Sequence, residues 1–345
     1  MEKNDSILEK LNTYSEAYSV MAPLILHTQL LGLLQGAYAT GVLKAALNPS
    51  TVEAIAAETE MSMDRTQDIC RALDAFGIFV KADNCYSLTE QWALLVTSDL
   101  IRTFQVSVSD AFAKAQMFSQ PGASYWQLSS EERLALAKGV TFNPSSSNTT
   151  DFYEFLFRDM LPEVVDRLTQ REIRYLELGC GVGGGLNGLL RTYPRVTAVA
   201  VDLAKDVLAE AQATAEALGH SERVTFIHDD ARNFDARNAF DLVYWSQFFF
   251  PRVGRPEVLQ VAYAALKPLG YLFAPLLLDP ISEENIHSAE GRQYAMSQLM
   301  YGGWDIPRLS AAEVKAEIEA AGFINVEVRT KPFLRLILAQ RSDIA

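Results

Sequence analysis

The sequence predicts an α/β protein with a doubly wound, mostly parallel sheet of seven strands, preceded by a mostly helical domain. An apolar stretch at residues 173–178 runs directly into a glycine-rich turn at residues 179–185. From there to residue 340, apolar runs of strand length alternate with helical patterns, as in sheets built from helical crossovers. The first 150 residues instead carry helical patterns and a single hairpin pattern.

Length and charge limit the classes of function. The 345 residues suffice for about two domains, and the polar loop 143–148 places their boundary so that the domains are 1–150 and 151–345. The net charge of −13 argues against nucleic acid and anionic membranes, which reward clustered Lys and Arg, and suits a neutral or cationic small molecule. Three widely spaced cysteines and an N-terminus without a secretory signal predict a cytoplasmic protein.

The first domain opens with apolar helical patterns. Between Leu30 and Leu47 there are more apolar residues at helical spacing than one compact face needs, which suggests a partner helix. The stretch from Val20 to Leu34 is interrupted by polar residues and is too short to span a bilayer. Residues 50–53 form a capping box that begins a short helix.

A helix from Asp64 to Ala75 and a hairpin over residues 78–88 follow, and this order suggests a winged helix. The helix carries two arginines against three aspartates. It therefore lacks the basic face that contact with DNA phosphates requires.

Strands and helices alternate in the second domain. Its helices are expected near residues 151–160, from Leu186, over 208–218 and 257–266, and from a capping box at Ser310 to Gly322. The last two strands are expected to pair antiparallel. The predicted strands are 173–178, 196–201, 224–227, 239–245, 271–278, 324–329 and 334–340.

The glycine turn is a candidate cofactor cradle. Gly179, Gly181 and Gly183 recur at every second position, where a turn needs backbone angles that a Cβ forbids and a ligand can press against bare backbone. The following helix N-terminus offers unpaired N–H groups. Asp202, at the tip of the second strand, can accept hydrogen bonds from ribose hydroxyls. The glycines alone also satisfy a dinucleotide fingerprint through Gly184, which leaves an NAD-dependent oxidoreductase open.

Four segments in order resemble class I S-adenosylmethionine-dependent methyltransferases: Glu177–Gly183, Asp202, Asp229–Ala231 and Leu266–Gly270. The N-terminal part resembles the winged-helix dimerisation domain of small-molecule, natural-product O- or C-methyltransferases. The resemblance implies a Rossmann-like sheet, S-adenosylmethionine as cofactor and a homodimer formed through the N-terminal helices. It also implies methyl transfer to oxygen, carbon or nitrogen of a small secondary metabolite.

The resemblance also assigns residues to the site. The glycine turn lies at the methionine end of the cofactor, Asp202 at the ribose, and Asp230 with Ala231 near the adenine. The cofactor-binding residues are predicted to be Tyr153, Glu177, Gly179, Gly181, Gly183, Asp202, Leu203, Asp229, Asp230, Ala231 and Ser246. The aromatic-lined substrate pocket is predicted to include Trp245, Phe248, Phe249, Phe250 and Met300.

The segment after the fourth strand departs from the resemblance. Phenol methyltransferases of this group carry a His-Asp-Trp segment there, with His as the general base, whereas this chain has Ser246-Gln247-Phe248. Among four histidines, His287 is the best candidate base, because an unperturbed imidazole titrates near neutral pH. Gln247 is a second predicted catalytic residue. It would replace one metal-binding histidine of carbon-methylating relatives, and we predict no metal.

Two alternative functions stay open from the sequence. The first is a non-catalytic winged-helix protein with a regulatory or cofactor-binding role. The second is the NAD-dependent oxidoreductase that the glycine fingerprint permits.

Overall fold

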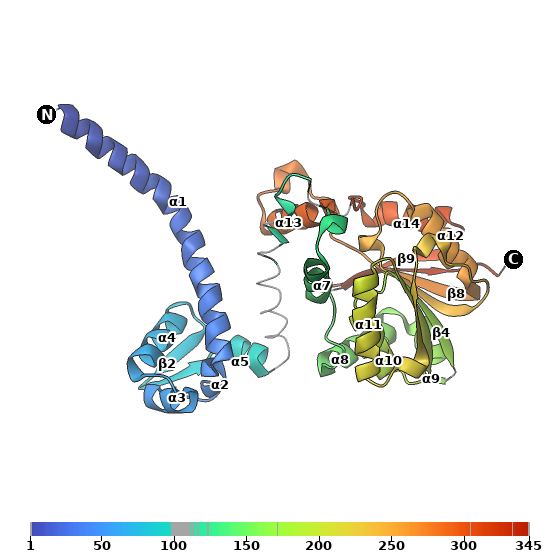
Figure 1. Cartoon of the computed structure of the whole chain (residues 1–345), viewed down its shortest axis with the longest axis horizontal. Coiled ribbons are helices and arrows are strands. Elements are labelled where there is room, and N and C mark those ends of the chain that lie inside the picture. Colours follow the sequence, from blue (N-terminus) through green and yellow to red (C-terminus); the bar gives the residue numbers. More distant parts are fainter. Residues whose placement is uncertain are drawn as a thin grey trace. The chain divides into compact units, whose positions relative to one another are not determined.

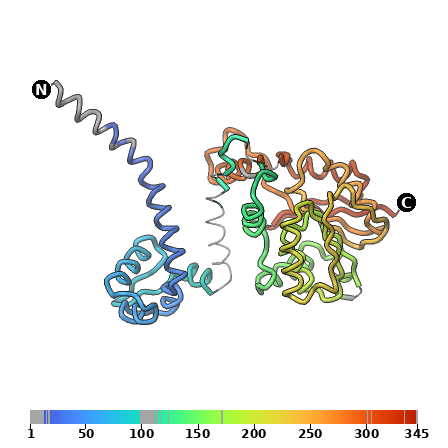
Figure 2. The backbone as a smooth tube through the Cα atoms, in the orientation of Figure 1, coloured from blue at the N-terminus to red at the C-terminus, as the bar shows by residue number. Residues whose placement is uncertain are grey.

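The computed structural model describes residues 2–97, 111, 114–115, 117–122, 124–170, 172–303, 305–332 and 334–343 (Figure 2). The chain forms two compact units, Met1–Val108 and Ser109–Ala345. The division thus falls before the predicted boundary at residue 150. Helices between residues 130 and 155 belong to the second unit, where they pack on the two helices that follow the glycine turn.

The first unit combines helices with a small antiparallel sheet. A short strand over residues 50–51 joins the predicted hairpin, so the sheet has the order β1-β3-β2. Its core contains Val42, Leu43, Ile55 and Leu73. The elements are α1 (Glu2–Ala39), α2 (Val42–Ala45), β1 (Ser50–Thr51), α3 (Val52–Thr59), α4 (Met63–Ala75), β2 (Phe79–Ala82), β3 (Cys85–Leu88) and α5 (Glu90–Thr97).

Helix α1 is longer and more exposed than the sequence pattern indicated. Its apolar side chains at positions 14, 18, 21 and 24 are 57% exposed or more. By length and composition alone, Tyr18–Ala39 has the features of a membrane span, and only 11% of an apolar 18-residue stretch within it is buried. The expectation that the apolar stretch is too short to span a bilayer was therefore wrong, because it continues to Ala39.

The cap of α3 also differs from the sequence prediction. Thr51, not Ser50, is the N-cap residue, and its side chain accepts a hydrogen bond from the N–H of Ala54. Ser50 instead donates its hydroxyl to the carbonyl of Ala45 at 2.9 Å. Ser50 is in strand β1, and this pairing shifts the beginning of the helix by one residue.

The sheet of the second unit is drawn in Figure 1, where β4, β8 and β9 are labelled. It has the predicted seven strands, in the order β6-β5-β4-β7-β8-β10-β9. Strands β4 to β8 are parallel, and β10 pairs antiparallel with both β8 and β9. This confirms the predicted fold and the final antiparallel pair. The strands are β4 (Ile173–Leu178), β5 (Val196–Asp202), β6 (Val224–His228), β7 (Phe240–Trp245), β8 (Leu266–Pro275), β9 (Ile324–Lys331) and β10 (Leu334–Gln340).

Helices cover both faces of this sheet. One apolar core packs residues of α8 to α10 against one face, and a second packs α12 and α14 against the other. The α-helices are α7 (Ser130–Gly139), α8 (Ser147–Phe155), α9 (Pro162–Gln170), α10 (Gly184–Thr192), α11 (Lys205–Ala217), α12 (Arg255–Ala265), α13 (Ala289–Gly302) and α14 (Ala311–Ala320). The short helical turns are η1 (Tyr125–Gln127), η2 (Leu156–Met160), η3 (Ser221–Arg223), η4 (Ala231–Asn233), η5 (Gln247–Phe249) and η6 (Glu283–Asn285).

Strand β8 begins earlier than the sequence pattern suggested. The predicted helix 257–266 was expected to stop at Lys267–Gly270, but Leu266–Gly270 lies in β8, and the register against β7 shifts between Phe240 and Leu242. Leu269 has φ 60° within this irregular stretch. An irregular strand of this kind has no simple alternating pattern for sequence analysis to detect.

Candidate functional site

The glycine turn joins β4 to α10 with bare backbone. Gly179, Gly181 and Gly183 have φ values of 79°, 56° and 70°, in the left-handed region that favours glycine. A Cβ on Gly179 would lie 2.9 Å from Cε2 of Phe250, so the turn and the aromatic segment after β7 are in close contact. The turn therefore has no room for a side chain at its first residue.

Asp202 connects the end of β5 to this turn. Its carboxylate accepts hydrogen bonds from the N–H of Gly181 at 2.8 Å and from the N–H of Ala204 at 2.9 Å. Burial raises the pKa of Asp202, and the two N–H donors oppose that rise by stabilising the ionised form. The carboxylate is thus held rigidly at the carboxyl edge of the sheet, where doubly wound proteins bind ligands.

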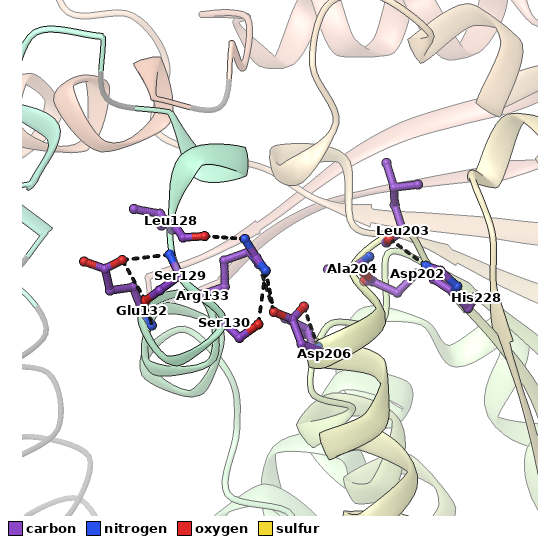
Figure 3. Close-up of polar contacts among 11 residues, drawn as sticks. Leu128, Ser129, Ser130, Glu132, Arg133, Asp202, Leu203, Ala204, Asp206 and His228 are labelled. Atoms are coloured by element: carbon purple, nitrogen blue, oxygen red, sulfur yellow. Dashed lines mark hydrogen bonds and ion pairs between the residues drawn. The ribbon is translucent and has the colours of Figure 1, made fainter.

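Helix α7 packs beside Asp202 and is held by charge (Figure 3). Ser129 and Glu132 form a capping box at its beginning. Arg133 donates to the carboxylate of Asp206 on α11 at 2.7 Å and to the carbonyl of Leu128. The ion pair therefore fixes the residues around α7 against the helix that follows Asp202.

A cavity of about 580 Å³ extends from the glycine turn across the carboxyl ends of the strands. This volume lies in the range typical of small-molecule sites, and apolar side chains, many of them aromatic, form most of its walls. Its aromatic lining consists of Tyr125, Trp126, Phe142, Phe152, Tyr153, Tyr175, Tyr244, Phe248, Phe249, Phe250 and Phe273. Its other predicted lining residues are Glu177, Gly179, Gly181, Asp202, Leu203, Asp230, Ala231 and Ser246.

Glu177 is the buried carboxyl group in this cavity. Burial raises its pKa to about 8, whereas the hydroxyl of Tyr175, which donates to Oε2 at 2.9 Å, lowers it. The negative charge of Asp202 contributes to the rise. Tyr244 pairs with Glu177 across β4 and β7, and burial raises its pKa as well. A cation that enters the cavity would therefore stabilise the ionised form of Glu177.

The charges around the cavity are predominantly acidic. Among the described lining residues, the carboxyl groups are Glu177, Asp202 and Asp230, the basic group is Arg232, and none is His or Lys. The guanidinium of Arg232 is paired with Asp230 at 2.6 Å. The cavity thus favours a cation and lacks an imidazole base in its described lining.

Neither predicted catalytic residue lines the cavity. His287 is exposed, and its carbonyl accepts a hydrogen bond from Arg292 at 2.6 Å. Gln247 is 4% exposed, and both ends of its amide are engaged: Nε2 donates to the carbonyl of Pro275 at 2.9 Å, and Oε1 accepts from Arg255 at 3.1 Å. These bonds leave Gln247 a structural residue, because its amide has no free end directed into the cavity.

Three further predicted residues, Trp245, Gly183 and Asp229, lie outside the lining. Trp245 is fully buried in the core beneath the sheet, because its position on β7 directs it away from the face that carries Tyr244. Gly183 begins α10, and Asp229 accepts hydrogen bonds from the N–H of Asp230 and from Asn233 within its own turn. Met300 belongs to α13, but its side chain is outside the described part of the chain.

Residues 125–142 form a wall that the sequence analysis missed. Tyr125, Trp126 and Phe142 line the cavity from this segment. A Cβ on Gly184 would lie 2.3 Å from the carbonyl oxygen of Phe142, so the segment packs directly on the first turn of α10. The capping box at Ser129 was a sequence signal for α7, but no local pattern could place that helix over the glycine turn.

Comparison with known proteins distinguishes between the two cofactors that the glycine turn permits, NAD and S-adenosylmethionine. Residues 176–270, which contain the turn and Asp202, match the methyltransferase domain family. No curated protein matches the chain by sequence.

Solved structures match the chain over nearly its whole length. An O-methyltransferase family protein from Burkholderia thailandensis is 19% identical with a TM-score of 0.61, covering 95% of this chain and 99% of that one. Human N-acetylserotonin methyltransferase is 16% identical with a TM-score of 0.59, covering 94% and 98%. Mitomycin 7-O-methyltransferase is 15% identical with a TM-score of 0.60, covering 96% and 100%. The predicted class I methyltransferase fold is confirmed.

Proposed function

We propose that this protein transfers a methyl group from S-adenosylmethionine to a small aromatic acceptor that is neutral or cationic. The observation that supports the proposal most directly is the juxtaposition of the side-chain-free turn at Gly179, the rigid carboxylate of Asp202 and an acidic, aromatic-walled cavity. The human relative was solved with S-adenosylmethionine, and the structural relative PigF with S-adenosylhomocysteine.

The described residues fit this cofactor in shape and charge. Gly179 and Gly181 offer backbone for close approach, and Asp202 offers carboxylate oxygens to ribose hydroxyls. Asp230 and Ala231 stand at the carboxyl end of β6, where the adenine would bind. Glu177 provides a carboxylate for the cationic end of the ligand.

When bound, the cofactor supplies an electrophilic methyl group on a positively charged sulfur. The chain contributes alignment and exclusion of water, because the aromatic walls and the segment 125–142 enclose the cavity. The ring faces of Phe248, Phe249 and Phe250 can stabilise a cation.

The cysteines at positions 70, 85 and 180 are free thiols, which agrees with the reducing cytoplasm where we place the protein.

The charge of the cavity restricts the acceptor. An acceptor carboxylate would find no unpaired cation in the described lining, because the guanidinium of Arg232 is already paired with Asp230 at 2.6 Å. With no imidazole in the described lining, the acceptor needs either a neutral nucleophile with a lone pair or a hydroxyl acidic enough to ionise without strong assistance. We therefore propose aromatic amines, heteroaromatic nitrogens and acidic hydroxyarenes as the acceptor class.

Replacing Asp202 by Asn tests the cofactor assignment. We expect at least a tenfold loss of affinity for S-adenosylhomocysteine, because the charged acceptor at the ribose position is lost. Isothermal titration of the full chain provides the measurement. Asp229→Asn is the matched control and should change the affinity less than twofold, since Asp229 does not line the cavity. Wild-type protein that fails to bind S-adenosylhomocysteine would contradict the proposed function itself.

We also propose that the first unit is a winged-helix dimerisation domain that pairs with a second copy through α1. The exposed apolar residues Tyr14, Tyr18, Met21 and Ile25 recur at spacings of three and four, as on one face of a helix. Residues 11–43 contain a single charged side chain, Glu16, and lack the basic residues of an interfacial membrane helix. A twin helix would cover this apolar face without requiring lipid.

The dimer is tested by light scattering coupled to size-exclusion chromatography. We expect twice the chain mass of 38.3 kDa for the wild type and a shift toward the monomer for Tyr18→Glu with Ile25→Glu. Glu16→Gln is the control and should remain dimeric. A monomeric wild type that pelleted with neutral phosphatidylcholine vesicles would instead indicate that α1 binds membranes.

A further inference from the structure

Arg255 is a buried charge that does not itself line the cavity. It is the first residue of α12 and is 1% exposed. Its guanidinium donates through Nε and Nη2 to the carboxylate of Glu317 on α14, at 3.1 and 2.7 Å, and lies 4.7 Å from the ring of Trp245. The two helices that cover one face of the sheet are thus joined by a bidentate ion pair.

The same guanidinium binds the turn η5 and the residue after it. Nη1 donates to the carbonyl of Gln247 at 2.8 Å and to the carbonyl of Phe250 at 3.4 Å. Nη2 also donates to Oε1 of Gln247 at 3.1 Å, and that side chain continues to the carbonyl of Pro275 on β8 at 2.9 Å. The turn from Gln247 to Phe250 is therefore attached at both ends to one cation.

This turn carries the aromatic wall of the cavity. Phe248, Phe249 and Phe250 all line it, and the Phe250 ring lies against the position that a Cβ of Gly179 would occupy. Without these bonds, a turn of this kind could adopt several conformations, because no strand or long helix holds its backbone carbonyls. A planar guanidinium with several donors in a fixed geometry restricts the turn to one conformation.

Stability alone does not account for this arrangement. Replacing a buried ion pair by apolar residues of similar volume is often neutral or stabilising, since the desolvation of both charges offsets their attraction. An apolar core could not supply directed hydrogen bonds to two carbonyls, an amide and a carboxylate at the same time. The geometric consequence is a fixed orientation of the Phe248–Phe250 segment.

We propose that Arg255 is a positioning residue for the methyl acceptor: it acts through Gln247 and the Phe250 carbonyl to hold the aromatic wall in the conformation that receives the acceptor. This inference rests on the proposed function for the identity of the ligand.

The test compares Arg255→Lys, which keeps the charge but loses the planar set of guanidinium donors, with Arg252→Lys at an exposed site three residues earlier. Hydrogen–deuterium exchange of the full chain should rise at least tenfold over residues 246–254 in Arg255→Lys and remain unchanged over residues 173–178. With a panel of hydroxyarenes and aromatic amines, KM for the acceptor should rise at least fivefold and by a larger factor than KM for S-adenosylmethionine, because the wall meets the cofactor turn only through Phe250. Arg252→Lys should behave as the wild type.

Two exchange results would overturn the inference. One is unchanged exchange over residues 246–254, and the other is an equal rise throughout the second unit, which would indicate only a loss of stability. Equal changes in the KM of both substrates would likewise contradict a role specific to the acceptor. If the wild type bound no S-adenosylmethionine, the proposed function would fail, whereas the exchange result would still decide whether Arg255 fixes the turn.

Discussion

Gly179→Ala is expected to lower affinity for S-adenosylhomocysteine about a hundredfold, the equivalent of roughly 3 kcal/mol. Two effects combine at this position. The residue has φ 79°, where an L side chain costs about 1–2 kcal/mol. The new Cβ would also lie 2.9 Å from Cε2 of Phe250 and 3.3 Å from Cβ of Ser246, so that the turn or the aromatic wall must move. Isothermal titration of the full chain measures the loss.

Gly219→Ala is the matched control for this experiment. Gly219 has φ 72°, but no atom lies within 4 Å of the position of its Cβ. Both substitutions therefore carry a similar backbone strain, and only Gly179→Ala crowds the cavity. We expect both variants to lose free energy of unfolding, Gly179→Ala by more because of its contact with Phe250, and we expect the loss of affinity to be confined to Gly179→Ala. Equal affinities for the two variants would show that the glycine turn does not contact the ligand.

The parallel sheet and its carboxyl-edge residues could be predicted because their signals are local. Apolar runs such as 196–201, glycines at alternate positions and an aspartate at a strand end each follow from the chemistry of a few neighbouring residues. The structure places Gly179, Gly181 and Asp202 together because parallel strands all end at the same edge of the sheet.

The residues that the sequence analysis missed or misplaced depend on contacts distant in the chain. Whether Gln247 faces the cavity or the core depends on Arg255 and Pro275, and the cover of the site at Phe142 depends on packing against Gly184. His287 was selected for its titration range, a property of the isolated side chain that says nothing about location. Only the arrangement of the elements in space could separate these residues from the lining of the cavity.

Glu177→Gln is expected to stabilise the second unit at alkaline pH while weakening cofactor binding. The pKa of Glu177 rises from 4.5 to about 8 on folding, so between these values the folded state retains a proton that the unfolded state releases. The free energy of unfolding contributed by Glu177 therefore falls as pH increases from 4.5 to 8, by an amount on the order of a few kcal/mol. The neutral amide of glutamine removes this dependence.

Urea unfolding followed by amide exchange of residues 173–178 reports on the second unit alone. We expect Glu177→Gln to match the wild type near pH 5 and to exceed its stability by about 2 kcal/mol or more at pH 8.5. Equal stabilities at both pH values would show that Glu177 titrates normally in the folded chain.

The same ionisation predicts how binding depends on pH. A cationic ligand favours the carboxylate form of Glu177, so wild-type affinity for S-adenosylmethionine should rise between pH 6.5 and 8.5, and that of Glu177→Gln should stay at least tenfold weaker and nearly flat. Tyr175→Phe removes the hydroxyl that donates to Glu177 at 2.9 Å and lowers its pKa, so the midpoint of the wild-type curve should move to higher pH. A midpoint that stays fixed in Tyr175→Phe, or a slope that survives in Glu177→Gln, would assign the pH dependence to the ligand and exclude Glu177 as its source.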